Sequence, residues 1–278
     1  AYFYMVYENA TNTVKDTVNL PKIVRYDYKA NKFSTYALDF EGVSVPEGMI
    51  KVTEKGDLAF VGVLADGSDK GFLNGQNLFE TALKWNKLAY IHFDINRTLS
   101  KTQESVMDIP DDWIAQYKEK GADFSKMELL EHKNQLFWVM EEFYVKEHNG
   151  RPQHRYYDVA IVGIDIEKGS INWATSFEKR QRDYIRGSML SYVAGFSGGQ
   201  LHFVYLNERG AQGKVVCRSV FLENGELSFT DLAKNSREDY LFFPRRSSMI
   251  SENKMMLMGV GSTERNDYKL IEVSFDGF

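Results

Sequence analysis

One stretch of the sequence decides the fold: Val159-Ala-Ile-Val-Gly-Ile-Asp-Ile-Glu-Lys-Gly-Ser-Ile-Asn-Trp173. An apolar run ends at Asp165, a short polar turn follows, and a second strand-like run continues to Trp173. Such runs on either side of a glycine-containing turn are typical of a β-hairpin. Gly169 can supply the positive φ that a tight turn needs, and the Asp165 carboxylate can accept hydrogen bonds from the turn amides.

The same strand–turn–strand pattern recurs along the chain. Its other copies are Ile23–Phe33, Leu88–Leu99, Val215–Phe229 and Leu270–Phe278. Further apolar runs precede the copies, at Tyr2–Tyr7, Leu58–Leu64, Leu136–Tyr144, Leu201–Leu206 and Met255–Val260. Most of these runs follow a shorter strand and a turn; the shorter strands are Met49–Thr53, Lys126–Leu130, Met189–Phe196 and Ser247–Ile250. The repeat predicts units of four antiparallel strands, with the first strand missing from the first unit and the fourth from the last.

So many strands do not fit one open sheet, because twisted sheets rarely exceed about ten strands. Small sheets stacked on their neighbours accommodate them better, which predicts an all-β chain with a β-propeller fold. The predicted units are 1–45, 46–108, 122–180, 184–234 and 240–278, forming a single β-propeller domain or a part of one. A pair of β-sandwiches is the alternative, but it predicts strands every roughly 8–12 residues without a longer period. One short helical insertion is expected at 110–121, between Pro110 and Gly121.

Composition and motifs argue against several classes of function. The net charge is −5, so the basic excess of a nucleic-acid binder is absent. No apolar run approaches the roughly 18 residues that cross a bilayer, so no membrane span is predicted. Nucleophile elbow, P-loop and Rossmann glycine fingerprints are absent, and the histidines show no metal-ligand spacing. We therefore predict no metal and no cofactor.

Three side chains within strand-like runs are expected to have structural roles. The single cysteine, Cys217, allows no intrachain disulfide and no cysteine metal cluster. Its surroundings predict a small buried side chain. His92 and His202 also lie in strand-like runs and are expected to be satisfied structural residues.

The phrase Asp165-x-x-x-Gly169-x-Ile171-x-Trp173 resembles the strand–turn–strand signature of quinoprotein-type propellers. Over most of its length the chain more closely resembles an uncharacterised family of exported β-propeller-like proteins from Gram-negative bacteria. The features that carry this resemblance are Tyr156–Asp165, the strand Ile171-Asn-Trp173 and the loop Glu178-Lys-Arg-Gln181. The resemblance implies a propeller fold and a periplasmic or cell-surface location, and it transfers no catalytic residue. The sequence itself shows no signal peptide.

Two loops between units concentrate arginine and tyrosine in an otherwise acidic protein. Loops of this kind gather on one face of a propeller, where guanidinium groups and tyrosine rings suit carboxylate, phosphate or sugar ligands. In the alternative interpretation these residues belong to the repeat, and Arg–Asp pairs link one blade to the next. The predicted ligand-binding residues of the two loops are Lys179, Arg180, Arg182, Tyr184, Arg186, Arg237, Tyr240, Arg245 and Arg246.

Two adjacent carboxylates stand in the run Leu136-Phe-Trp-Val-Met-Glu-Glu-Phe-Tyr144. Strand alternation places Glu141 and Glu142 on opposite faces, so one of them lies against an apolar surface, where desolvation raises a carboxyl pKa. A glycosidase needs two carboxylates facing each other roughly 5–9.5 Å apart, which adjacent strand residues do not provide. Glu141 therefore joins the predicted ligand-binding residues, and no catalytic residue is predicted.

These observations predict a non-enzymatic β-propeller of the bacterial cell envelope that binds a ligand or a partner protein through its interblade loops. A glycan, an anionic small molecule or a protein is the expected ligand. The alternative is a glycan-acting hydrolase or lyase that uses carboxylates from several blades. A third interpretation is a sensory domain of a larger signalling protein.

Overall fold

The computed structural model describes residues 2–5, 21–40, 43, 45, 48–64, 87–95, 99–111, 126–183, 191–207, 214–232, 240–261 and 268–275. In these residues the chain is all-β, and its strands form five antiparallel sheets in sequence order. A one-turn 3-10 helix, η4 (Pro244–Arg246), lies within the last sheet. No helix among the described residues has both the length and the apolar character needed to cross a membrane.

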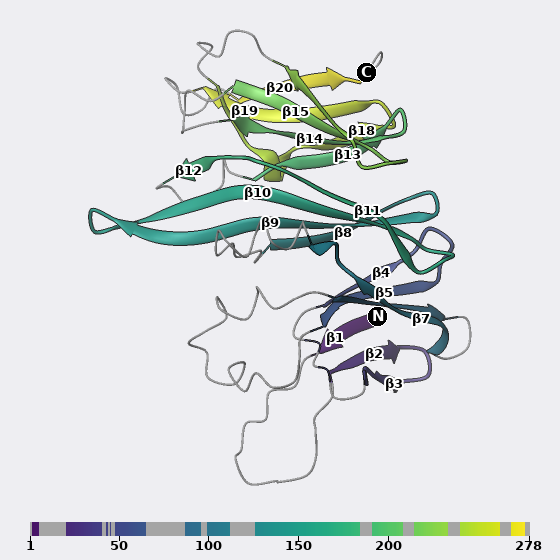
Figure 1. Ribbon diagram of the computed structural model, residues 1–278. Coiled ribbons are helices and arrows are strands. Elements are labelled where there is room, and N and C mark those ends of the chain that lie inside the picture. Colours follow the sequence, from purple (N-terminus) through teal and green to yellow (C-terminus); the bar gives the residue numbers. More distant parts are fainter. Residues whose placement is uncertain are drawn as a thin grey trace. The chain divides into compact units, whose positions relative to one another are not determined.

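The strands of each sheet are labelled in Figure 1. The first sheet contains β1 (Tyr2–Met5), β2 (Lys22–Asp27) and β3 (Lys32–Ala37). The second contains β4 (Gly48–Val52), β5 (Leu58–Leu64), β6 (Lys87–Asp94) and β7 (Ser100–Asp108). The third contains β8 (Lys126–His132), β9 (Gln135–His148), β10 (Arg151–Asp165), β11 (Ser170–Phe177) and β12 (Gln181–Asp183). The fourth contains β13 (Val193–Ser197), β14 (Gln200–Asn207), β15 (Lys214–Phe221) and β16 (Leu227–Asp231), and the fifth contains β17 (Tyr240–Phe242), β18 (Ser248–Ser251), β19 (Lys254–Gly261) and β20 (Tyr268–Ser274).

Each sheet is a meander of consecutive strands, which is the topology of a propeller blade. Two strands are interrupted, one in the third sheet and one in the fifth. β11 and β12 both pair with β10, and β17 and β18 both pair with β19. Pro244 lies in the second interruption, where the absence of its amide proton prevents a ladder hydrogen bond. Residues 178–180 form the first interruption.

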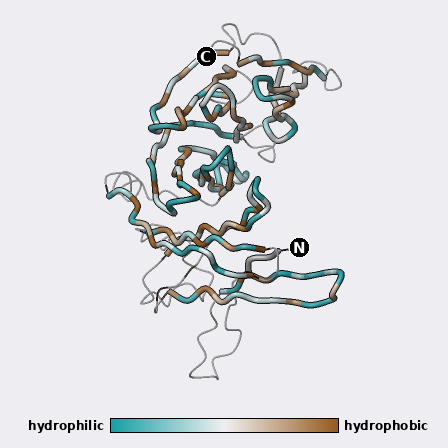
Figure 2. The backbone as a smooth tube through the Cα atoms, turned by 90° about the vertical axis from the view of Figure 1, so that its right-hand side faces the viewer, coloured by the Kyte–Doolittle hydropathy of each residue, from teal (hydrophilic) through white to brown (hydrophobic). Residues whose placement is uncertain are grey.

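Burial falls from the inner strands of a sheet to its outermost strand. Every residue of β5 is buried, and only the last residue of β14 is partly exposed, whereas β7 and β16 are mostly exposed. A strand that is buried on both faces has a continuous apolar run, which explains why Leu58–Leu64 and Leu201–Leu206 show no alternation. Figure 2 shows the resulting succession of apolar (brown) and polar (teal) segments along the chain.

The chain divides into two compact units. The first comprises residues 1–123, 128–138 and 162–174, and the second comprises residues 124–127, 139–161 and 175–278. In the first unit, side chains of the first two sheets share one core, which contains Ile23, Leu38, Phe40, Val45, Leu58, Phe60, Leu64, Ala89, Ile91 and Phe93. In the second unit, the fourth and fifth sheets share another, which contains Val193, Val204, Leu206, Cys217, Met255, Leu257 and Phe275. Within each unit, neighbouring sheets therefore stack through apolar side chains, as propeller blades do.

The all-β, blade-by-blade fold predicted from the sequence is confirmed. The predicted runs at Leu58, Leu136, Leu201 and Met255 lie in β5, β9, β14 and β19, each in a different sheet. Among the described residues, the first sheet has three strands and the last sheet has no strand beyond β20, as the repeat predicts. The predicted helical insertion at 110–121 lies outside the described residues, apart from its first two positions.

The turn chemistry predicted for the repeat is also confirmed. Asp165 Oδ1 accepts hydrogen bonds from the amides of Glu167 and Lys168, both at 2.9 Å, and Gly169 has a φ of 61°. Asp27 makes the same two contacts with its own turn, and these hydrogen bonds lower the pKa of Asp27. The acidic residue that ends the third strand therefore shapes the turn.

Cys217 and His202 have the structural roles predicted for them. Cys217 is 1% exposed, and burial raises the pKa of its thiol to about 11, so it is not a reactive thiolate at neutral pH. His202 is also buried, with Nδ1 at 2.7 Å from Ser219 Oγ and its ring stacked on Phe275. Burial lowers the pKa of His202, which favours the neutral imidazole.

Candidate functional site

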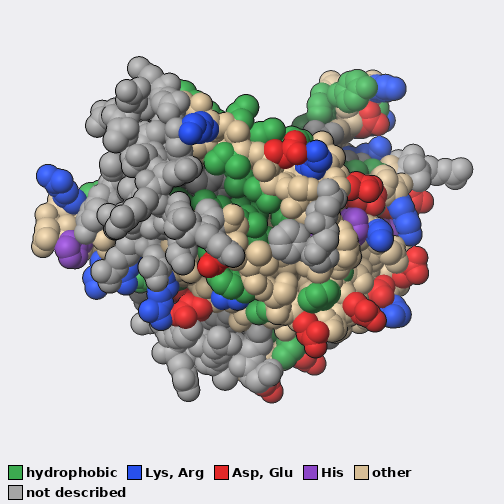
Figure 3. Space-filling view, turned by 90° about the horizontal axis from the view of Figure 1, so that it is seen from above, with side chains coloured by type: hydrophobic (Ala, Val, Ile, Leu, Met, Phe, Trp, Pro, Cys, Tyr) green, Lys and Arg blue, Asp and Glu red, His purple; other side chains and the backbone are tan. Residues whose placement is uncertain are grey.

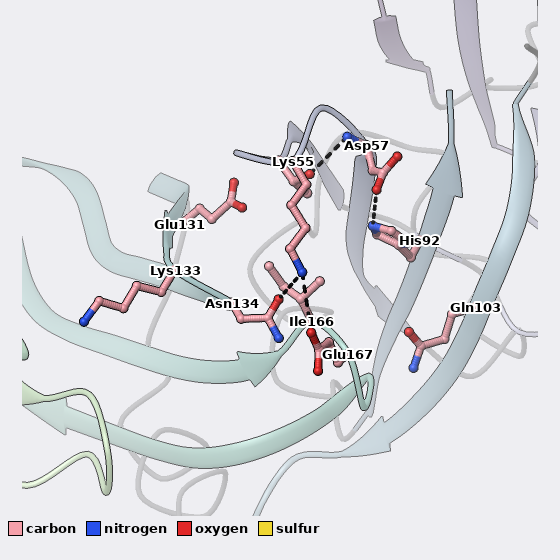
Figure 4. Close-up of a pocket in the computed structure, with 10 residues that line it drawn as sticks. Lys55, Asp57, His92, Gln103, Glu131, Lys133, Asn134, Ile166 and Glu167 are labelled. Atoms are coloured by element: carbon pink, nitrogen blue, oxygen red, sulfur yellow. Dashed lines mark hydrogen bonds and ion pairs between the residues drawn. The ribbon is translucent and has the colours of Figure 1, made fainter. Parts of the chain in front are cut away.

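A polar pocket of about 240 Å³ lies at one end of the second and third sheets, entirely within the first unit. We call it the Glu131 pocket. It is lined by the β4–β5 turn (residues 53–57), the β8–β9 turn (131–134), the β10–β11 turn (166–167), His92 on β6 and Gln103 on β7 (Figure 4). These turns lie at the ends of the strands opposite to the interblade loops that the sequence favours.

Hydrogen bonds tie the three turns of the pocket together. The amide of Glu54 donates to Glu131 Oε1 at 2.8 Å, which links the β4–β5 turn to the β8–β9 turn. The amide of Ile166 donates to the carbonyl oxygen of Asn134 at 3.1 Å, which links the β8–β9 turn to the β10–β11 turn. Gly56 has a φ of 88°, a backbone conformation that closes the first turn tightly and favours glycine. The lining is therefore held in place by backbone groups.

Glu131 has one satisfied and one unsatisfied carboxylate oxygen. Oε1 accepts the Glu54 amide, but Oε2 is buried and no group of the described residues donates to it. Burial raises the pKa of Glu131. A buried acceptor without a partner costs about 1–3 kcal/mol, so such an atom in the wall of a pocket calls for a ligand that brings a donor.

The hydrogen bonds of His92 determine which of its ring nitrogens carries the proton. Thr102 Oγ1 donates to the His92 carbonyl oxygen at 3.0 Å, and the same Oγ1 lies 3.0 Å from His92 Nδ1. Because the hydroxyl proton is used by the carbonyl, Nδ1 is the donor of the neutral ring, and we assign the lone pair to Nε2. Nε2 lies 3.7 Å from Asp57 Oδ2. His92 is thus placed to accept a proton, with a carboxylate beside it to balance the charge.

The remaining lining is polar and mixed in charge. Lys55 Nζ donates to Asn134 Oδ1 at 3.1 Å and lies 3.5 Å from Glu167 Oε1, whereas Lys133 points away from the pocket (Figure 4). In the same view, Glu131 lies on one side of Lys55 and the Asp57–His92 pair on the other. Carboxylate acceptors therefore alternate with ammonium and amide donors around the hollow, which suits a ligand rich in hydroxyl groups.

Glu131→Gln is expected to raise the thermal stability of the protein above that of the wild type by more at neutral pH than at acidic pH. The pKa of Glu131 is higher in the folded chain than its ordinary value of 4.5, so the native state loses stability as the pH rises from that value through the raised pKa. Glutamine does not ionise and keeps the acceptor for the Glu54 amide. Thermal melts of both proteins at about pH 4 and pH 7.5 should show a larger gain for the variant at the higher pH. A difference that is independent of pH would contradict this account of Glu131.

Comparisons with known proteins leave the function open. No family model and no curated protein matches the chain, so membership of the uncharacterised exported family stays a prediction. The polysaccharide lyase Uly1 aligns over 92% of this chain and 53% of its own, with a TM-score of 0.41 and 10% identity. Cobalt-substituted Synechocystis ACO aligns over 92% of this chain and 52% of its own, with a TM-score of 0.35 and 8% identity. The Dos1 propeller aligns over 90% and 61%, with a TM-score of 0.28 and 8% identity. This chain spans about half the length of the first two structures, and we draw no functional argument from any of the three.

Two of the binding residues predicted from the sequence, Lys179 and Glu141, form a buried ion pair in the second unit. Neither side chain has any exposed surface. Ser191 Oγ donates to Glu141 Oε2 at 2.6 Å, and Lys179 Nζ also donates to Gln181 Oε1 at 2.8 Å. Both predicted residues are thus brought together, but in the interior rather than on a face that meets solvent.

Strand-like alternation directs Lys179 into this interior. Lys179 lies in the gap between β11 and β12, and burial alternates through this gap: Phe177, Lys179 and Gln181 are buried, whereas Glu178 and Arg180 are exposed. Its ammonium lies 5.6–5.9 Å from the ring centres of Tyr156, Tyr192 and Tyr205, which adds cation–π attraction. Ser191, which bonds to Glu141, has a φ of 82°, and such strain in a residue other than glycine persists only where the surroundings enforce it.

Three of the other predicted binding residues have described side chains. Arg180 is exposed and pairs with Glu178. Arg182 lies in β12 and donates to the Tyr157 hydroxyl at 3.0 Å. Arg246 is exposed in η4 and lies 5.7 Å from the centre of the Phe243 ring.

The rest of the predicted binding residues are not brought into a described site. Tyr240 lies in β17 and Arg245 in η4, as elements of the backbone only. Tyr184, Arg186 and Arg237 fall outside the described residues. Ligand binding by the two arginine-rich loops stays a prediction.

Sequence reasoning missed both Glu131 and His92. His92 lies near the end of β6, and its strand position alone predicts only a structural role. Glu131 lies near the end of β8, in a run that resembles any polar turn. Their importance comes from the meeting of turns that are far apart in the sequence, for which no local motif exists. Within the described residues, no cluster of three or more histidine, cysteine and acidic side chains could hold a metal ion.

Proposed function

We propose that this chain binds a glycan in the Glu131 pocket and acts on it as a hydrolase or lyase. The observation that carries the proposal is the buried Glu131 Oε2 in the wall of a polar pocket, an acceptor for which the described part of the chain offers no donor. Sugar hydroxyls are donors that such an acceptor lacks, and the nearby carboxylates, amides and Lys55 supply the complementary contacts. Net negative charge and a mixed lining support a sugar over a nucleic acid.

Action on the glycan, beyond its recognition, is supported by a carboxyl group and an imidazole that line the same pocket. The raised pKa of Glu131 lets its carboxyl group hold a proton that it can give to a leaving glycosidic oxygen. His92 Nε2 can take a proton, either from water in hydrolysis or from a ring carbon in β-elimination. Asp57 would then balance the imidazolium. In both reactions the proton taken by His92 and the proton given by Glu131 leave the total charge unchanged.

The test combines binding and turnover with single-residue variants. Glycan panels should first identify a bound oligosaccharide by calorimetry, and its cleavage should then be followed by new reducing ends and by the ultraviolet absorbance of unsaturated products. Glu131→Gln and His92→Gln are each expected to lower kcat by about 10²–10⁴-fold, because each removes a group that transfers a proton. Glu131→Gln should also weaken binding, because it replaces an acceptor at the Oε2 position.

The matched control is Asp108→Asn, which removes an exposed carboxylate of β7 in the same unit. It should leave binding and turnover unchanged. Binding without cleavage would indicate that the protein recognises a glycan without acting on it, which agrees with the non-enzymatic function predicted from the sequence. No binding of any glycan, or equal activity of Glu131→Gln and the wild type, would overturn the proposal.

A further inference from the structure

A second polar surface lies on the β9–β10 hairpin, within the second unit. The distal parts of these two strands run on as a long arm (Figure 1) that ends in the turn Asn149-Gly150. Both turn residues have positive φ, at 53° and 70°, which is the two-residue turn that keeps the flanking strands in direct register. That register places Tyr144 opposite Arg155, and both contribute to one face of the arm.

Two arginines stand side by side on this face. Arg155 on β10 and Arg182 on β12 are direct partners in the antiparallel ladder. Like charges directly opposite each other repel and destabilise a sheet. Figure 3 shows one face of the molecule, on which basic (blue) and acidic (red) side chains are intermixed.

The two arginines donate hydrogen bonds to neutral partners. Among the described residues neither guanidinium has an ion-pair partner; instead, Arg155 donates to Gln153 Oε1 at 2.8 Å and Arg182 donates to the Tyr157 hydroxyl at 3.0 Å. Glu142, which alternation places on the same face, is only 8% exposed. Two positive charges are thus held together without a counter-charge from the described protein.

Tyrosine rings hold the guanidinium groups in position. Arg155 lies 5.7 Å from the ring centre of Tyr144, and Arg182 lies 5.9 Å from that of Tyr157. The two rings meet edge to face, with their centres 5.5 Å apart. All four side chains are partly exposed, so a solute can reach them. Such rings preorganise the arginines and also offer flat surfaces for a sugar ring.

We propose that Arg155, Arg182, Tyr144 and Tyr157 form a binding site for the carboxylate groups of an acidic glycan. A planar carboxylate matches the two-pronged guanidinium group, and a second arginine beside it accommodates a second oxygen or the next acidic sugar. The anion site stands on its own geometry, whereas the choice of a glycan as its carrier rests on the proposed function. This would make the ligand a polymer rich in uronic acids.

The test measures binding of oligogalacturonate to the wild-type chain and to Arg155→Gln, Arg182→Gln and the double variant. Each single change is expected to weaken binding by about tenfold or more, because each removes charge-assisted hydrogen bonds. The weakening should shrink as salt is added. Lys254→Gln is the matched control, since Lys254 is a partly exposed cation of β19 in the same unit that already pairs with Glu272, and it should bind like the wild type.

Three further probes identify the carrier of the charge. A neutral galactan should bind equally to the wild type and the double variant. Poly-L-glutamate presents carboxylates without sugars, and dextran sulfate presents sulfates on sugars, and both should bind more weakly than oligogalacturonate. Tighter binding of either polymer would overturn the assignment to a uronic-acid glycan, and unchanged binding of oligogalacturonate by the double variant would overturn the site itself.

The effect of the arginine variants on the melting temperature distinguishes a structural role of the arginines from a role in binding. Because the two charges repel, Arg182→Gln should leave the melting temperature unchanged or raise it while binding is lost. A clear fall in melting temperature with unchanged binding would assign the pair to the fold and sink the proposal. Glu131→Gln separates the two proposals: acidic-glycan binding that survives Glu131→Gln but not the double arginine variant supports this site and counts against the pocket.

Discussion

Replacement of Lys179 by alanine is expected to lower the free energy of unfolding by about 3–5 kcal/mol, because it leaves the Glu141 carboxylate buried without its counter-charge. Glu141 has no exposed surface and cannot regain the hydration that it loses on folding. The Ser191 hydroxyl, which donates to Glu141 Oε2, supplies a neutral hydrogen bond. Chemical denaturation of wild type and variant, followed by tryptophan fluorescence and circular dichroism, would measure the difference.

Two companion variants make this result specific. Arg180→Ala removes the exposed cation next in sequence and should change stability by less than about 0.5 kcal/mol. The double replacement Lys179→Met with Glu141→Leu removes both charges and should recover much of the loss, since apolar side chains often substitute well for a buried ion pair. If Lys179→Ala costs no more than Arg180→Ala, the buried pair does not hold this part of the second unit together.

Phe60→Ala is expected to destabilise the first unit by about 3–5 kcal/mol, the usual cost of deleting a fully buried aromatic ring. Phe60 is completely buried in the core shared by the first two sheets. Two glycines, which have no side chain, lie against its ring. Gly48 and Gly62 are paired across β4 and β5, and a Cβ at either position would lie 2.5 Å from an atom of the Phe60 ring. Equilibrium unfolding in urea would report the loss.

The same ring makes an alanine at position 62 costly. Gly62→Ala should destabilise by about 1–3 kcal/mol, because the added methyl group meets the ring and also the Val45 side chain. In a Phe60→Leu background the shorter side chain leaves room, so the added cost of Gly62→Ala should fall. Additive effects of the two changes would show that the ring and the glycine are not in conflict.

Local sequence patterns predict the strands of this protein better than they predict its candidate site. Leu58–Leu64 reads as a buried strand because seven apolar residues follow the turn Lys55-Gly56-Asp57, and β5 has these bounds. The Asp165 turn was predictable because a carboxylate, a glycine and an apolar flank each impose a short-range constraint. Such constraints act within a few residues, so the printed sequence is enough to find them.

The pocket and the buried ion pair depend on contacts that no short window contains. Glu131 is a candidate site residue because the amide of Glu54, 77 residues earlier in the sequence, donates to its Oε1, while Oε2 has no donor among the described residues. Lys179 was predicted to face a ligand because it belongs to a loop rich in arginine and tyrosine, yet it lies on the buried side of the alternation that runs from Phe177 to Gln181. Arg182 belongs to the same predicted loop, yet it lies in a strand beside Arg155, which the sequence analysis did not single out.

The arm formed by β9 and β10 has a consequence for how this protein can change over evolutionary time. Its tip bears no core, so insertions or deletions there alter reach rather than stability. A strand rises about 3.3 Å per residue, so removing two residues from each side would draw the tip in by about 7 Å and keep Tyr144 and Arg155 facing the same way. Removing one residue from each side would instead turn every side chain beyond the cut to the opposite surface. Relatives should therefore differ in the length of this arm by even steps.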